Sequence, residues 1–113
     1  MFVSDIEKLG MTEKESKIYL TSLRVGPASM QVLARKAKID RGTAYHVAMT
    51  LGEKGLFGIV SPGKRPTFGV RDPQVLFTYV EERKREADAH FVTVQGMIDD
   101  LKDLYQSGFT EGA

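Results

Sequence analysis

Two short amphipathic segments on either side of a three-residue turn constrain the fold more than any other feature of this sequence. The first segment follows Ser29, and the second follows Asp40; both are residue types that commonly cap the N-terminus of a helix. In each segment the apolar residues recur at helical spacing: Met30, Leu33, Ala34 and Ala37 in the first, and Ala44, Val47, Ala48 and Leu51 in the second. Two helices joined by so short a turn form a helix-turn-helix.

A further helix is predicted before this pair, over residues 13–25. Thr12 and Glu15 have the spacing of a capping box, in which each side chain accepts a hydrogen bond from the backbone of the other. Gly26 and Pro27 end the helix. We expect one face of it to pack inward, through Ser16, Tyr19, Leu20 and Leu23.

The apolar period changes after Gly55, where "LFGIVSPGKRPTFGV" reads as two short strands around a loop. Pairing Ile59 with Phe68, and Phe57 with Val70, would place these four large side chains on one buried face. The opposite face would then carry Gly58 and Gly69. This glycine pair is either a bare patch open to an approaching backbone or two tolerated glycines.

A long helix is predicted from Asp72-Pro73 to about Gln106, with apolar residues in a heptad pattern typical of a coiled coil. Its second half carries an apolar stripe too wide to leave in water, which is called the α-stripe below: Phe91, Val94, Met97, Ile98, Leu101, Leu104 and Tyr105. We expect a second copy of the chain to cover this stripe and form a homodimer. The competing arrangement is a helix folded back across its own domain.

These elements predict a mainly α fold with a small β-hairpin, a winged helix-turn-helix with a long C-terminal dimerisation helix. The expected parts are a winged helix-turn-helix domain over residues 1–72, the dimerisation helix over 73–107 and a flexible tail over 108–113.

Charge is distributed unevenly along the chain, although the whole sequence has a net charge of +1. Residues 1–70 hold 11 basic and 6 acidic residues, whereas residues 71–113 hold 5 and 9. Within residues 24–65 the counts are 8 basic and 2 acidic. This asymmetry indicates either a polyanionic partner for the first part of the chain or an ordinary solvated surface.

Several classes of protein are disfavoured by what the sequence lacks. There is no Cys, and the two His residues are far apart, so we expect no disulfide, no metal site and no cofactor. His90, alone on its helix, reads as structural. No nucleophile, base and orienting group can be assembled, so the chain is not expected to be an enzyme. Without a signal peptide or a long apolar run, we expect a soluble, cytoplasmic protein with no membrane contact.

Four motifs in order resemble the N-terminal DNA-binding domain of the TrmB-like transcriptional regulators. The first is "LGMTEKESKIYL" (residues 9–20), and the second is "GPAS" (26–29). The third is Arg41, Thr43, Ala44 and Tyr45, matching R-x-T-[AV]-Y, and the fourth is "EKGL" (53–56). The resemblance covers roughly residues 6–73. It departs from the family where "MTLG" replaces an "LERL"-like helix end, and where a helix stands in place of the C-terminal sugar-binding domain of many members, so sugar sensing is not implied.

The resemblance implies that the helix after Asp40 enters the major groove of double-stranded DNA, whose width admits one helix. Arg41 could donate two hydrogen bonds to guanine, and the loop cations Lys64 and Arg65 could contact the backbone or the minor groove. The full set of predicted DNA-binding residues is Ser29, Gln31, Arg35, Lys36, Arg41, Thr43, Tyr45, His46, Thr50, Lys64 and Arg65. Two alternatives stay open: a winged helix that contacts only proteins, and a repressor that senses an unknown small-molecule effector in a pocket against the long helix.

Overall fold

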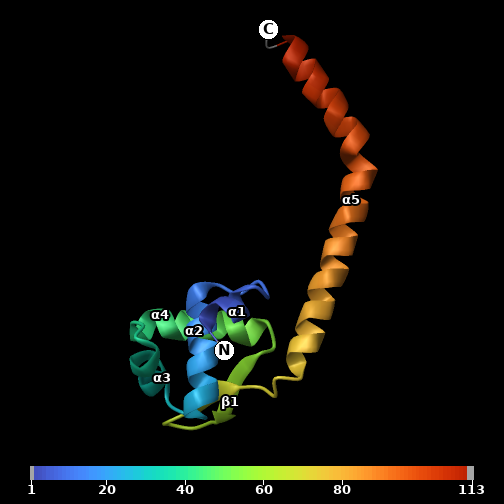
Figure 1. The fold of residues 1–113 in the computed structure, drawn as a ribbon. Helices are drawn as coiled ribbons and strands as arrows, with labels where there is room; N and C mark the ends of the chain where they lie inside the picture. The colour runs from blue at the N-terminus through green and yellow to red at the C-terminus, as the bar shows by residue number, and fades with distance from the viewer. Residues whose placement is uncertain (1, 112–113) are drawn as a thin grey trace. The chain divides into compact units, whose positions relative to one another are not determined.

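Five helices and one β-hairpin make up residues 2–111, the part of the chain that the computed structural model describes (Figure 1). In chain order they are α1 (Val3–Glu7), α2 (Glu13–Val25), α3 (Met30–Ala37), α4 (Arg41–Glu53), β1 (Phe57–Ser61), β2 (Thr67–Val70) and α5 (Val75–Glu111). Helices followed by a hairpin, with α3 and α4 joined by a short turn, confirm the predicted winged helix-turn-helix and its long C-terminal helix.

Side-chain hydrogen bonds cap the N-termini of α2, α3 and α4 at the residues that the sequence predicts. At α2, Thr12 Oγ1 accepts from Glu15 N at 3.1 Å, and Glu15 Oε1 accepts from Thr12 N at 2.9 Å, which completes the capping box. Ser29 Oγ accepts from a backbone amide of α3 at 3.2 Å, and Asp40 Oδ2 accepts from one of α4 at 3.1 Å. One short helix, α1, was not predicted; its backbone N–H at Phe2 donates to Asp5 Oδ2 at 2.9 Å.

The core lies among α1 to α4 and the base of the hairpin. All eight apolar residues predicted to face inward from α3 and α4 are buried. On α2 the prediction is right for Ser16, Tyr19 and Leu20 but wrong for Leu23, whose side chain is 39% exposed in the last turn of the helix. Ile18, which was not predicted, is fully buried, because α2 is covered by neighbours on more than one side.

The hairpin has the predicted register, with Phe57 opposite Val70 and Ile59 opposite Phe68. However, the prediction that all four side chains are buried is wrong, since Ile59 is 61% exposed. Ile59 lies two residues beyond the buried Phe57, where the strand lines an open groove instead of a closed core. The glycine face is not bare either. A Cβ added to Gly58 would lie 3.1 Å from the Arg71 guanidinium, which shows that a side chain already covers this face.

A third backbone segment pairs with the hairpin. Ala28, in the turn between α2 and α3, forms an isolated antiparallel bridge with Phe68 of β2. Ala28 N donates to Phe68 O at 3.1 Å, and Phe68 N donates to Ala28 O at 2.8 Å. This bridge fixes the start of α3 beside the hairpin.

The chain divides into two compact units, one up to Val80 and one from Glu81 onward. The first turns of α5 belong to the first unit, where Tyr79 Oη donates to the Leu9 carbonyl at 3.1 Å. Helix α5 continues to Glu111, beyond its predicted end and into the segment predicted as a flexible tail, while residues 112 and 113 lie outside the described residues. No helix in residues 2–111 is long and apolar enough to cross a membrane.

Candidate nucleic-acid interface

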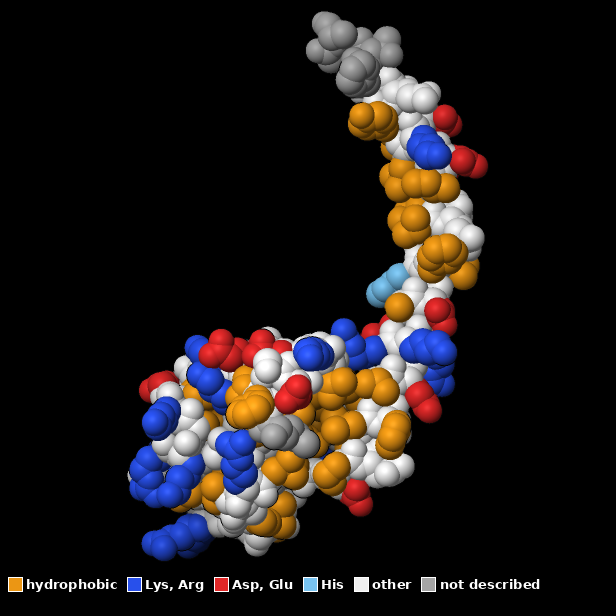
Figure 2. All heavy atoms as spheres, in the orientation of Figure 1, with side chains coloured by type: hydrophobic (Ala, Val, Ile, Leu, Met, Phe, Trp, Pro, Cys, Tyr) orange, Lys and Arg blue, Asp and Glu red, His pale blue; other side chains and the backbone are white. Residues whose placement is uncertain are grey.

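The start of α3, the start of α4 and the hairpin loop meet around one concave surface of about 430 Å³, called the basic cleft here. Its lining comes from residues far apart in the sequence: Ser29, Met30, Gln31, Arg41, Tyr45, Lys64, Arg65, Pro66 and Phe68. The bridge between Ala28 and Phe68 explains why α3 and the hairpin lie side by side here. In Figure 2 the Lys and Arg side chains gather over α3 and the hairpin loop.

Among the described residues, every charged side chain that lines the basic cleft is positive: Arg41, Lys64 and Arg65. All three are exposed. Helix α3 begins at the cleft with the neutral cap Ser29, so the partial positive charge of its N-terminus adds to that of the side chains, whereas the carboxylate of Asp40 offsets the same charge at the start of α4. The cleft therefore attracts an anion whose charges are spread over the distance between two helix ends and a loop.

Six of the eleven residues predicted to bind DNA line the basic cleft: Ser29, Gln31, Arg41, Tyr45, Lys64 and Arg65. Two others, Arg35 and Lys36, are exposed on the last turn of α3 but do not line it. Thr43 is half-buried, and its hydroxyl donates to the capping carboxylate of Asp40 at 3.4 Å.

Two predicted residues face a different part of the domain. His46 is exposed and lines a hollow of about 500 Å³ beside the N-terminus of α2. Thr50 lines the same hollow, and its Oγ1 lies 2.7 Å from both Glu15 Oε2 and the Val47 carbonyl. The expectation that Thr50 lies on the open face of α4 therefore differs from its position in the structure, where it is turned toward α2.

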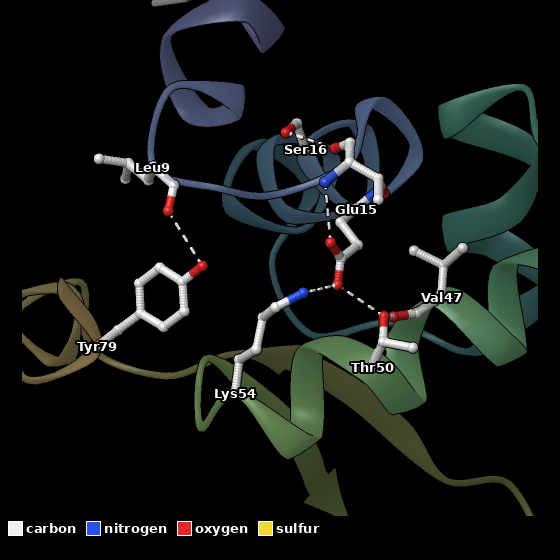
Figure 3. Close-up of polar contacts among 8 residues, drawn as sticks. Leu9, Glu15, Ser16, Val47, Thr50, Lys54 and Tyr79 are labelled. Atoms are coloured by element: carbon white, nitrogen blue, oxygen red, sulfur yellow. Dashed lines mark hydrogen bonds and ion pairs between the residues drawn. The ribbon is translucent and has the colours of Figure 1, made fainter. Parts of the chain in front are cut away.

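Glu15 is the buried carboxylate that holds this side of the domain together (Figure 3). It accepts hydrogen bonds from the Thr12 backbone, from Thr50 Oγ1 and from the ammonium of Lys54. Burial alone would raise the pKa of Glu15, but these hydrogen bonds together with the charge of Lys54 hold the pKa below its ordinary value. Glu15 is thus a charged structural link between α2 and the C-terminal end of α4.

An apolar groove of about 210 Å³ adjoins the basic cleft between α4 and β1. It is lined by Met30, Tyr45, Ala48, Met49, Gly52, Phe57, Gly58, Ile59 and Phe68. Met30, Tyr45 and Phe68 line both surfaces. Sequence reasoning missed Met49 and Ile59 as surface residues. A signal for Met49 was present, since it follows Arg41 and Tyr45 at four-residue spacing and so lies on the same side of the helix.

Comparison with known proteins identifies a family for this chain and shows its fold in other proteins. Residues 6–82 match the family described as "Sugar-specific transcriptional regulator TrmB". The chain is 29% identical over 77 residues to the HTH-type sugar sensing transcriptional regulator TrmBL1 of Pyrococcus furiosus, and this match covers 68% of the chain but 22% of that relative.

Two solved structures share the fold. One is TrmBL2, an archaeal chromatin protein, with a TM-score of 0.72 and 16% identity over 93% of this chain and 41% of that one. The other is a possible transcriptional regulator from Methanosarcina mazei, with a TM-score of 0.64 and 14% identity over 85% of this chain and 88% of that one.

Proposed function

The chain belongs to the TrmB family of transcriptional regulators, and from this premise we propose that it binds double-stranded DNA sequence-specifically as a homodimer. The single observation that carries the proposal is the basic cleft, in which the described residues of α3, α4 and the hairpin loop present three cations and no carboxylate. A DNA duplex is the anion that fits the basic cleft, because the cleft extends from two helix starts to the hairpin loop and a duplex carries phosphates at regular intervals over such a distance.

The proposed roles follow from where each side chain lies. Helix α4 enters the major groove, where the Arg41 guanidinium donates two hydrogen bonds to a guanine edge. Gln31 and the α3 amides behind the Ser29 cap hold phosphate oxygens. Lys64 and Arg65 reach the flanking backbone from the hairpin loop, and Arg35 and Lys36 add long-range attraction.

His46 and Thr43 have smaller parts in this scheme. The side chain of His46 is exposed on α4 and can form a hydrogen bond with a base edge or a phosphate. Thr43 acts through Asp40, which it helps to hold as the cap of α4. We leave Thr50 out of the interface because its hydroxyl already bonds Glu15.

The proposal of a homodimer is supported by the exposed side chains of the α-stripe. Its seven apolar side chains are each between 37% and 72% exposed, and Figure 2 shows hydrophobic side chains following this part of α5. So many apolar side chains along one helix are costly in water, and a second α5 in a coiled coil would cover them. A dimer would also present two α4 helices to the two halves of a palindromic site.

Selection of preferred duplexes from a random library by the intact chain tests the proposal. We expect the selected duplex to bind at least about a thousandfold more tightly than a shuffled one at physiological salt. Arg41→Ala should cost about 1–3 kcal/mol of that discrimination, because it removes a base contact. Arg85→Ala, an exposed arginine of α5, is the matched control and should leave discrimination unchanged. Equal affinity of the intact chain for selected and shuffled duplexes would contradict sequence-specific binding.

A further inference from the structure

We propose that the apolar groove beside the basic cleft reads thymine, with Met49 and Ile59 contacting the 5-methyl groups of thymines in the major groove. This inference rests on the proposed DNA binding and names part of its specificity. It assigns a role to two apolar side chains that the fold leaves exposed.

The exposure of both residues is the first observation. Met49 is 56% exposed on α4, and Ile59 is 61% exposed on β1, although both adjoin a well-packed core. Both line the same groove, Met49 from helix α4 and Ile59 from strand β1. The folded chain leaves this apolar surface in contact with water. A binding partner that buries the surface therefore gains free energy from removing it from water.

Continuity with the basic cleft is the second observation. Arg41, Tyr45 and Met49 follow one another at four-residue spacing along one side of α4. Tyr45, which is 53% exposed, lines both the cleft and the groove. A duplex that meets Arg41 in its major groove therefore continues along the same side of the helix to Met49.

The chemistry of the groove selects the occupant. Among the described residues no charged side chain and no amide side chain lines it, and Tyr45 brings its one side-chain hydroxyl, so the groove offers little to the polar edges of guanine or cytosine. The 5-methyl of thymine is the apolar group that a base presents in the major groove. The groove volume of about 210 Å³ lies below the range of about 300–1,000 Å³ usual for small-molecule sites, which favours a projecting group over a whole ligand.

The first test of the thymine contact alters the DNA and leaves the protein unchanged. In the selected duplex, each thymine is replaced in turn by uracil, which pairs identically and lacks only the methyl group. We expect at least one position in each half-site where uracil weakens binding by about three- to fivefold, the effect of exposing about one buried carbon. Because the protein is unaltered, a folding defect cannot produce this result.

Variants then assign the effect to residues. Met49→Gln keeps the length and helix propensity of the side chain but makes its end polar. Ile59→Thr makes the matching change on the strand. At the sensitive positions both variants should bind thymine and uracil duplexes equally. Val60→Thr is the control, because Val60 is a neighbouring exposed residue whose side chain lies against Gly69 on the other face of the hairpin.

The outcomes distinguish a failure of the thymine contact from a failure of the proposed DNA binding. Tight binding of the selected duplex with no effect of uracil at any position would overturn the thymine contact and leave DNA binding intact. Retained discrimination in both Met49→Gln and Ile59→Thr would equally overturn the assignment to this groove. An intact chain that binds no duplex would overturn the proposed function itself.

Discussion

Thr50 and Glu15 are 35 residues apart in the chain, yet Thr50 Oγ1 donates to Glu15 Oε2 at 2.7 Å. Glu15 also accepts from Thr12 N and from the ammonium of Lys54, so one carboxylate joins the start of α2 to the end of α4. This link sets the position of α4 and thereby of the surface that we propose to read DNA.

Removing the charge of Glu15 should destabilise the fold. We expect Glu15→Gln to lower the free energy of unfolding at neutral pH by about 1–3 kcal/mol, because the Lys54 ammonium loses its ionic partner and a buried network loses acceptors. Denaturant titration measures this quantity. Glu13→Gln is the matched control, since the Glu13 side chain is mostly exposed and pairs with Lys17 at the surface.

The same carboxylate predicts a pH dependence. The pKa of Glu15 in the folded chain lies below its ordinary value, so its contribution is present above the unfolded-state pKa and is lost as the pH falls through the folded-state pKa. The difference in unfolding free energy between the natural chain and Glu15→Gln should therefore shrink as the pH is lowered from about 6 to about 3. A difference that stays constant over this range would contradict the ionic link.

Two tyrosines offer a matched comparison of hydroxyl groups. Tyr79 Oη donates to the Leu9 carbonyl, whereas the Tyr19 hydroxyl is buried with no hydrogen-bond partner in the part of the chain that the structure describes. We expect Tyr79→Phe to cost about 1 kcal/mol and Tyr19→Phe to be neutral or stabilising. Thermal unfolding of the two variants checks this order, and the reverse order would contradict it.

The loop cations should contribute affinity without specificity. We expect the double variant Lys64→Ala/Arg65→Ala to weaken all duplexes alike and to reduce the log–log salt slope of binding by about 0.9 for each phosphate that the variant no longer neutralises. Lys84→Ala/Arg85→Ala removes the same charge from α5 and is the control. If the salt slope of the loop variant is unchanged, Lys64 and Arg65 do not neutralise DNA phosphates, and the prediction is wrong.

Sedimentation tests the proposed dimer. We expect the intact chain to sediment as a dimer at about micromolar concentration, since an apolar stripe of this length needs a cover. Leu101→Lys places a charge in the α-stripe and should yield a folded monomer, whereas Asp103→Lys, on the opposite side of the helix, should leave the dimer intact. A monomeric natural chain would contradict the two-site geometry on DNA.

How far the sequence could predict this structure depends on the range of the interactions involved. The helix starts at Ser29 and Asp40 were predictable, because each cap is made by residues three apart. The hairpin register was also predictable, because alternating apolar residues admit one pairing. The bridge between Ala28 and Phe68 was not, since nothing local marks Ala28 as a sheet residue.

The candidate site divides in the same way. The cations of the basic cleft were found from the sequence, because a charge excess within residues 24–65 is visible without a structure. The position of Thr50 was missed, because its direction on α4 is decided by Glu15 on another helix. The exposure of Ile59 was missed for a similar reason: alternation gives the face of a strand, and only the packed fold shows how far the covering elements extend.

Mapping the DNA-bound surface by NMR tests the central claim most directly. A selected duplex is titrated into the isotope-labelled chain, and the shifts of the backbone amides are followed. We expect the largest changes around Ser29–Gln31, Arg41–Tyr45, Met49 and the loop at Lys64 and Arg65. Changes confined to the hollow beside the N-terminus of α2 or to residues 81–108 of α5, or the absence of any change, would contradict binding through the basic cleft.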